Sequence, residues 1–255
     1  ELIYGPSDQV GPFATMGIIQ PLDTLFEAAF FSEFVENAIV EFKNQKWMVG
    51  DVVGNHLMLM YNKKLISSPP ENTDELIQIG KAMTRDLDGD GRMDQYGLVW
   101  NFTEPFFYAP WLGGFGGWLI TDENQPDLNT EANQDGFAFI KSLRDEHNII
   151  PRECDYEIAN AMFLGGDAAM IINGDWSWGN YIGKVDFGIA RIPMVSETGL
   201  WPTPIVSTKG YSINANQSGE NLEQVKSLLR YLTSVEVQLI FTKRTNSQPS
   251  SIQAL

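Results

Sequence analysis

The segment from residue 155 to residue 178 reads DYEIANAMFLGGDAAMIINGDWSW. Ile158, Met162 and Phe163 recur in it at helical spacing, which predicts a short helix with one apolar stripe facing the core. The Gly165-Gly166 pair should end that helix, because glycine adopts the left-handed conformation that a helix terminus often needs.

A buried strand is expected directly after the two glycines. Ala168–Ile172 is a short apolar run bounded by turn residues, and such a run fits a buried strand better than a second helix. Asn173-Gly174-Asp175 should then form a turn that places Trp176 and Trp178 at the end of the strand. In open α/β sheets ligands bind beyond the carboxyl ends of the strands, so these two large aromatic side chains are candidates for a ligand site.

The order of residues in this segment resembles a family signature. In the extracellular solute-binding proteins of carbohydrate ABC transporters, and most closely in maltose/maltodextrin-binding proteins, a Tyr precedes a helix. Phe-x-x-Gly-x-x-Ala-Met and then Asn-Gly-x-Trp-x-Trp follow it. Each fragment alone is weak evidence, but the ordered set is specific. The matching residues here are Tyr156, Phe163, Gly166, Ala169, Met170, Asn173, Gly174, Trp176 and Trp178.

The resemblance implies an α/β chain with the type II two-lobed fold of periplasmic binding proteins, in which discontinuous lobes are joined by hinge crossings around a ligand cleft. Residues 1–53 and 211–245 are expected to form the first lobe and residues 54–210 the second lobe, with a last hinge crossing at 246–255. The family's opening strand–helix–strand and its closing helices have no counterpart here. We therefore expect the chain to be a segment that lacks the N-terminal and C-terminal parts of a longer protein.

Composition restricts the class of partner. The chain has 255 residues, of which 43% are apolar, enough for one large core or two smaller ones. Its formal net charge of −16 argues against binding to nucleic acid or to an anionic membrane surface, because nothing strongly basic is present to neutralise phosphates. No apolar run reaches the roughly 18 residues of a membrane span. The single cysteine, Cys154, cannot form an internal disulfide.

The resemblance also implies contacts to sugar in the second lobe. The turn Glu104-Pro105-Phe106 resembles the family's Glu-Pro-aromatic turn, in which Glu104 would accept hydrogen bonds from hydroxyl groups and Phe106 would stack on a sugar ring. Tyr156 and Trp176 are the expected stacking platforms. Trp178 is a second choice, because it can instead pack inward. Ordinary packing in the core is the alternative interpretation of the aromatic side chains.

Two further candidates are Asp8, in the first lobe, and Asn55, where the chain of the resembled family crosses from one lobe to the other. Asp8 matches the family's Asp that bonds sugar hydroxyls, although the neighbouring Trp and Arg of the family are replaced by Gly5 and Gln9. A helix N-cap is an equally good interpretation of Asp8. Asn55 stands where maltose binders have a Glu, and its amide still offers a donor and an acceptor to hydroxyl groups.

An acidic loop predicts a metal site away from the sugar. In the run DLDGDGRMD, carboxylates occupy the first, third, fifth and ninth places and a glycine occupies the sixth, as in the calcium loop of EF-hands. The twelfth place, where EF-hands have a bidentate Glu, is Gly97. A structural calcium is expected, with an acidic turn as the alternative, and no cofactor is expected for the function itself. The predicted metal-site residues are Asp86, Asp88, Asp90, Arg92 and Asp94.

Apolar periodicity also predicts helices at residues 21–40, with an interruption near Ser32, at residues 72–83 and at residues 130–147. The second of these should have Thr73 as its N-cap. The last one should turn Phe137, Ile140 and Leu143 toward the core.

Sugar binding without chemistry is the predicted function. Aromatic side chains cover the C–H faces of sugar rings, and charged acceptors bond the hydroxyl rims. The chain has no nucleophile elbow, phosphate loop or zinc-helix motif. We therefore expect it to bind a maltose-like oligosaccharide in the periplasm or outside the cell. It would deliver the sugar to the transmembrane subunits of an ABC importer without inserting into the membrane.

Two alternatives stay open. One is a glycoside-active enzyme with Glu104 as its acid, in which Asp155 or Asp175 would supply the second carboxylate. The other is a sensory or adaptor domain that uses the same fold to bind sugar without transport.

Overall fold

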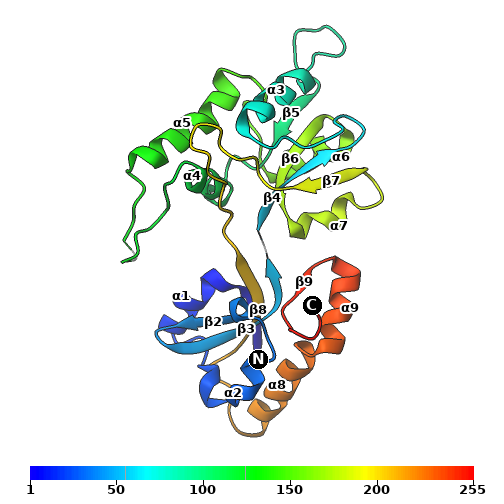
Figure 1. Cartoon of the computed structure of the whole chain (residues 1–255). Coiled ribbons are helices and arrows are strands. Elements are labelled where there is room, and N and C mark those ends of the chain that lie inside the picture. The colour runs from blue at the N-terminus through cyan, green and yellow to red at the C-terminus, as the bar shows by residue number, and fades with distance from the viewer. Residues whose placement is uncertain (55, 124) are drawn as a thin grey trace. The chain divides into compact units, whose positions relative to one another are not determined.

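A computed structural model describes residues 1–54, 56–123 and 125–255 of the chain. These residues divide into two compact units, each with its own sheet (Figure 1). Unit 1 comprises Glu1–His56 and Val206–Leu255, and unit 2 comprises Leu57–Ile205. The two transitions were expected at 53/54 and 210/211, so the boundaries of the units differ from the expected ones by three and by five residues.

Unit 1 is built around an antiparallel sheet with the strand order β1-β8-β3-β2, to which β9 adds by pairing with β3. Short 3-10 helices, labelled η, connect several of its strands and helices. The elements of unit 1 are β1 Leu2–Pro6, η1 Ser7–Gln9, α1 Val10–Thr15, η2 Leu22–Thr24, α2 Ala28–Phe31, η3 Glu36–Ala38, β2 Ile39–Phe42, β3 Gln45–Gly54, β8 Ser207–Ile213, α8 Gly219–Leu232, α9 Val235–Thr245 and β9 Gln248–Pro249.

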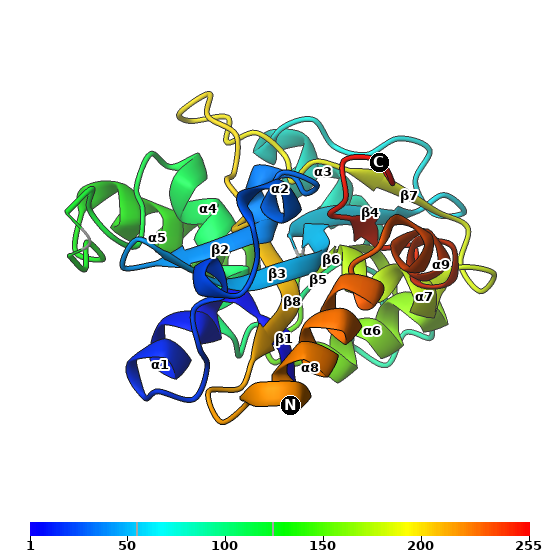
Figure 2. The same cartoon turned by 90° about the horizontal axis from the view of Figure 1, so that it is seen from below.

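Side chains that alternate along β3 contact apolar residues on both faces of this sheet. Met48 and Val49 are successive in the strand, so their side chains point to opposite faces. Val49 packs with the phenylalanines of residues 26–34 and with Val225 and Leu229 of helix α8, whereas Met48 packs with Val10 and Ile19. Figure 2 labels helix α8 together with the strands of this unit. The sheet therefore separates two apolar clusters.

The C-terminal segment packs within unit 1. The side-chain oxygen of buried Gln238, in α9, accepts hydrogen bonds from the amides of Ser250 and Ser251, each at 2.8 Å. Strand β9 pairs with β3 at the same place. Residues 246–255, which were expected to form a last hinge crossing, thus lie inside unit 1.

Unit 2 contains a four-stranded sheet with the order β5-β6-β4-β7, in which β5 and β6 are parallel and the other pairs are antiparallel. The elements of unit 2 are β4 Leu57–Asn62, α3 Thr73–Met83, β5 Tyr96–Val99, η4 Pro105–Phe107, α4 Ala109–Gly114, α5 Glu131–Asp145, α6 Tyr156–Gly165, β6 Ala168–Gly174, η5 Asp175–Ser177, α7 Trp178–Tyr181 and β7 Phe187–Ala190.

The sheet of unit 2 is buried on both faces. In β4, Leu57 and Leu59 belong to one apolar cluster, and Met58 and Met60 belong to another. Helices α3, α4 and α5 cover the first cluster, and helices α6 and α7 cover the second (Figure 1). A strand buried on both faces is expected to read as a continuous apolar run, as β4 and β6 do.

The helix expected at residues 21–40 is wrong for most of its length, although the interruption expected near Ser32 is found, since α2 ends at Phe31. This segment forms η2, the four-residue helix α2, η3 and the first residues of β2. The amide of Val35 donates to the carbonyl of Ser250 at 2.9 Å, and Phe34 forms a β-bridge with Ser251. Backbone partners from the opposite end of the chain thus replace the hydrogen bonds that a continuous helix would have made.

The helices expected at residues 72–83 and 130–147 are confirmed as α3 and α5. Asn72 caps α3 in place of Thr73, because its side-chain oxygen accepts a hydrogen bond from the amide of Glu75 at 3.0 Å. In α5 the expected inward residues Ile140 and Leu143 are buried, but Phe137 is 44% exposed.

Candidate ligand-binding site

Helix α6, strand β6 and the turn after them carry the central candidates. Asp155 caps the start of α6, and Gly166, with φ of 86°, ends it in the left-handed conformation. Strand β6 is buried along its full length and includes Asn173-Gly174, which were expected in the turn. The turn begins at Asp175, two residues later than expected, as the short helix η5.

Three of the predicted sugar contacts form one group in unit 2. The indole Nε1 of Trp176 donates a hydrogen bond to the Tyr156 hydroxyl at 3.0 Å. The ring of Phe106 lies 6.2 Å from that of Trp176, centroid to centroid, with the planes inclined at 51°. All three side chains are half-buried and pack against the cluster that contains Leu57 and Leu59. We call Phe106, Tyr156 and Trp176 the aromatic patch.

Glu104 is exposed on the turn that carries Phe106. It precedes the short helix η4, and its Oε2 accepts a hydrogen bond from Asn101 Nδ2 at 3.2 Å. Asn101 is buried, and its Oδ1 accepts from the amide and the hydroxyl of Thr103 at 3.0 and 2.7 Å. These bonds hold the turn, while the carboxylate of Glu104 keeps further lone pairs for donors in solution.

Trp178 packs on the other side of the sheet. Its half-buried ring lies against the apolar cluster of α6 and α7, which includes Met58, Phe163 and Tyr181. The aromatic patch packs against the opposite face, so Trp178 has the inward packing that was the alternative to a sugar contact.

The two remaining candidates, Asp8 and Asn55, lie in a different part of the chain. Asp8 is exposed in η1 of unit 1. In the described part of this unit, the N-cap positions of η1 and α1 are occupied by Pro6 and Gln9, so Asp8 does not cap either helix. Asn55 lies outside the described residues.

The acidic loop at residues 86–94 is exposed except for half-buried Asp86, and its own backbone amides hold it by hydrogen bonds. Asp86 accepts hydrogen bonds from the amides of Gly89 and Gly91 at 2.7 and 2.9 Å, which hold the pKa of its carboxyl below the ordinary value. Carboxylate oxygens of Asp86, Asp88 and Asp94 lie within 4.8 Å of one another. Three of the predicted ligands therefore converge on one point.

The remaining residues of the predicted metal site are arranged differently. Asp90 is not part of the converging set, and its carboxylate accepts a hydrogen bond from the amide of Arg92 at 2.8 Å. Gly97, at the twelfth place, is buried in β5, where an added Cβ would lie 2.4 Å from the backbone of Gly80. The close approach of helix α3 therefore explains why no bidentate Glu occupies this place.

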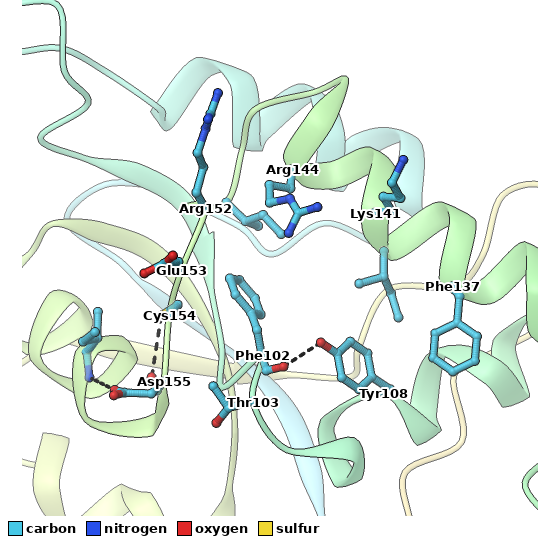
Figure 3. Close-up of a pocket in the computed structure, with 13 residues that line it drawn as sticks. Phe102, Thr103, Tyr108, Phe137, Lys141, Arg144, Arg152, Glu153, Cys154 and Asp155 are labelled. Atoms are coloured by element: carbon cyan, nitrogen blue, oxygen red, sulfur yellow. Dashed lines mark hydrogen bonds between the residues drawn. The ribbon is translucent and has the colours of Figure 1, made fainter.

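A pocket of about 680 Å³ opens in unit 2 beside the start of α6 (Figure 3). Phe102 lies in it, and the hydroxyl of Tyr108 donates to the Phe102 carbonyl at 2.7 Å. Phe137 and Ile158, both expected in the core, line this pocket and are 44% and 45% exposed. Sequence reasoning missed the pocket because helical spacing identifies an apolar stripe but not which part of it another element covers.

Comparison with known proteins finds similar sequences that together cover most of the chain. A model of the family described as bacterial extracellular solute-binding protein matches residues 1–254. The maltotriose-binding protein of Pyrococcus abyssi is 28% identical over 218 residues, which cover 82% of this chain and 46% of that protein. The maltodextrin-binding protein MdxE of Bacillus subtilis is 24% identical over 78% of this chain and 48% of its own length. The chain thus spans about half the length of these curated relatives.

Solved structures show the same likeness. The maltose/maltodextrin-binding domain MalE from Bdellovibrio bacteriovorus, bound to maltotriose, is 56% identical, with a TM-score of 0.95 over 100% of this chain and 67% of that one. The Thermus thermophilus maltotriose-binding protein, also bound to maltotriose, is 26% identical, with a TM-score of 0.84 over 99% and 68% of the two chains. The predicted two-lobed α/β fold is confirmed by these similarities.

Proposed function

The chain belongs to the family of bacterial extracellular solute-binding proteins, and from this premise we propose that it binds a maltose-like oligosaccharide and leaves the sugar chemically unchanged. The family predicted from the segment 155–178 is thereby confirmed. The choice of sugar is supported by relatives whose names or bound ligands are maltotriose and maltodextrin.

The aromatic patch beside Glu104 is the observation that carries the proposal. Phe106, Tyr156 and Trp176 offer ring faces to the C–H face of a sugar, and Glu104 offers a charged acceptor to its hydroxyl rim. Micromolar affinity needs about 8 kcal/mol. A few stacked rings and several hydroxyl bonds, at roughly 1–3 kcal/mol each, supply that energy net of the ordering costs. Asp8, in unit 1, and Asn55 are proposed as additional hydroxyl contacts.

Titration with maltotriose, followed by tryptophan fluorescence and by calorimetry, tests this proposal. We expect saturable binding in the unmodified chain and a loss of about 100-fold or more in affinity for Trp176→Ala, because a central aromatic anchor is removed. Trp201→Ala is the matched control, since Trp201 is 43% exposed and stacks with Arg191 at 5.3 Å. Equal affinity of the two variants would remove Trp176 from the site.

Binding without catalysis is favoured because the two other carboxylates considered for a glycosidase pair, Asp155 and Asp175, are a helix cap and a buried group. The side chain of Asp155 caps α6 by accepting from the amide of Ile158 at 2.8 Å, and Asp175 is 8% exposed. We expect maltotriose to be recovered intact after long incubation with the chain, as measured by chromatography. Release of glucose or maltose that stops in Glu104→Gln would instead support the glycoside-active alternative.

We further propose that the loaded protein delivers the sugar to the transmembrane subunits of an ABC importer at the outer side of the cytoplasmic membrane. The extracellular character of the family supports this placement. Within the part of the chain that the structure describes, no helix has both the length and the apolarity to cross a membrane. Stimulation of importer ATP hydrolysis in vesicles by the chain together with maltotriose, but by neither alone, is the expected result.

The acidic loop is proposed to bind a structural calcium ion. Carboxylate oxygens are the ligands that calcium prefers, and those of Asp86, Asp88 and Asp94 already converge. Calcium should raise the melting temperature of the chain relative to chelator, and Asp88→Asn should abolish this rise without changing sugar affinity. A melting temperature that is equal in calcium and in chelator would leave the loop as an acidic turn.

A further inference from the structure

A buried polar network lies behind the aromatic patch in unit 2. Asn160 of α6, Asn173 of β6 and Tyr181 of α7 are 7%, 1% and 0% exposed. The side-chain amide of Asn173 donates to Asn160 Oδ1 at 3.2 Å and to the Tyr181 hydroxyl at 3.0 Å, and this hydroxyl donates in turn to Asn160 Oδ1. Burial raises the pKa of Tyr181 to about 12, so the hydroxyl keeps its proton.

Two further hydrogen bonds connect this network to the backbone of the patch. Asn160 Nδ2 donates to the carbonyl of Tyr156 at 2.6 Å. Asn173 Oδ1 accepts from the amide of Gly174 at 2.8 Å, two residues before Trp176. The network is therefore bonded to the backbone of Tyr156 through Asn160, and to the backbone just before Trp176 through Asn173.

Gly174 provides the space in which the indole lies. A Cβ built on this residue would be 1.9 Å from the Trp176 ring. The φ of Gly174 is −96°, a value that any residue adopts. The requirement for glycine here is therefore steric and comes from Trp176 itself.

Building on the proposed function, we propose that Asn160, Asn173 and Tyr181 are positioning residues, which fix the relative positions of the Tyr156 and Trp176 rings. Gly174 leaves the space that the Trp176 indole occupies. All three side chains are buried and act on a ligand only through the two rings. Hydrogen bonds are directional and apolar contacts are not, so a fully paired network defines one arrangement of the rings where an apolar core would allow several.

Alanine at the two ring-covered glycines provides a matched test. Gly174→Ala is expected to displace the Trp176 indole and to weaken maltotriose binding about tenfold or more, as for the loss of one well-placed contact. Gly188, in β7 of the same sheet, is covered by the ring of Tyr61, to which an added Cβ would approach within 2.3 Å. Gly188→Ala should therefore lower the melting temperature similarly and leave the affinity within about twofold. Equal affinities of the two variants would overturn the role of Gly174.

Alanine at two buried asparagines tests the network itself. Asn133 is 0% exposed, and its side-chain amide donates to the carbonyls of Trp118 and Asp127 at 2.8 and 2.6 Å. Asn133→Ala and Asn160→Ala should both lower the melting temperature, because each leaves buried polar groups unpaired. Only Asn160→Ala should weaken maltotriose binding, by about tenfold. If both variants lost affinity equally, or if neither lost affinity, Asn160 would have only a structural role.

A measurement without ligand separates this inference from the proposed function. The difference in near-ultraviolet circular dichroism between a chain and its Trp176→Phe form reports on Trp176 alone. Asn160→Ala should change this difference spectrum, and Asn133→Ala should leave it unchanged. Absence of maltotriose binding in the unmodified chain would reject the proposed function, whereas an unchanged spectrum in Asn160→Ala would reject the positioning role.

Discussion

Each unit contains a pair of contacting aromatic side chains, and the two pairs are supported by different chemistry. In unit 2, Tyr156 and Trp176 share a direct hydrogen bond and rest on the neutral groups of a buried network. In unit 1, the rings of Tyr4 and Tyr211 lie 5.0 Å apart on the paired strands β1 and β8, and their hydroxyls face the carboxyl of Asp51. One pair is backed by amides and a phenol, the other by an acid.

Asp51 occupies an unusual place for a carboxyl group. It is the extra residue of a bulge in β3, is 6% exposed, and its Oδ1 has no hydrogen-bond partner among the residues that the structure describes. Burial raises its pKa to about 6, although the hydroxyls of Tyr211 and Tyr4 act in the opposite direction. The comparison shows that an aromatic pair held by neutral hydrogen-bonding groups should be insensitive to pH, whereas a pair held by a carboxyl group is coupled to the binding of a proton.

The largest effect on stability is expected from removing Phe163, the apolar side chain that packs against Tyr181 of the network in unit 2. Phe163 is 0% exposed, and its ring lies 5.0 Å from that of Tyr181. Phe163→Ala should lower the free energy of unfolding by about 3–5 kcal/mol, measured with urea, at acidic and neutral pH alike. Phe137→Ala, at a 44% exposed position, is the control and should cost far less. A similar cost at both positions would contradict the assignment of the core.

The second effect concerns the acid in unit 1. Because the folded state binds the Asp51 proton more tightly than the unfolded state, the contribution of Asp51 to stability should fall as the pH rises from 3.8 to about 6 and then level off. Asp51→Asn should therefore stabilise the chain above pH 6, by at most about 3 kcal/mol, and should have little effect below pH 4. Urea unfolding at a series of pH values checks this. Parallel pH profiles for the two proteins would exclude Asp51 as the titrating group.

The third effect is smaller and should not depend on pH. Tyr181→Phe removes one hydroxyl from the network and keeps the ring, so it should cost about 1 kcal/mol of stability. The pKa of Tyr181, raised to about 12, keeps this group neutral at ordinary pH, and the cost should be the same at pH 5 and pH 8. A cost that changes across this range would mean that the network contains an ionising group after all.

The smallest effect is expected for Tyr211→Phe. Loss of this hydroxyl removes a donor that lowers the pKa of Asp51, so the folded state should hold the proton to still higher pH. The variant should lose about 0.5 kcal/mol of stability at neutral pH and less at pH 4, where the carboxyl is protonated. The difference between the two urea-unfolding free energies is the informative quantity, and a loss confined to low pH would reverse the argument.

Much of the aromatic patch follows from the sequence because its determinants are local. Gly166 ends α6, the apolar run of β6 follows at once, and the tryptophan comes directly after the strand. The network behind the patch does not follow in this way. Asn160 is a polar residue on the buried side of a helix, where apolar periodicity instead selected Ile158, which is 45% exposed. Its partner Asn173 is recognisable only once helix and strand are packed together.

Long-range pairing explains the clearest failure. The spacing of phenylalanines in residues 21–40 suits a helix, yet those side chains are buried in a cluster that also contains Val49 and Leu229. The backbone of Val35 is bound by Ser250. No window of local sequence contains both partners, so tertiary contacts override the helical pattern here. Asp8 and Asn55 remain predictions, since one is an exposed residue of unit 1 and the other lies outside the described residues.

The hydrogen bond from Trp176 to Tyr156 has a consequence for how the phenol recognises a ligand. Its oxygen accepts the indole proton, so its own O–H proton is directed elsewhere and is left to donate. A group beside Tyr156 that supplies a lone pair therefore accepts this proton whether or not the group itself carries a hydrogen. Replacing the contacted sugar hydroxyl by fluorine would preserve a weak acceptor, whereas replacing it by hydrogen would leave the phenol facing a C–H bond.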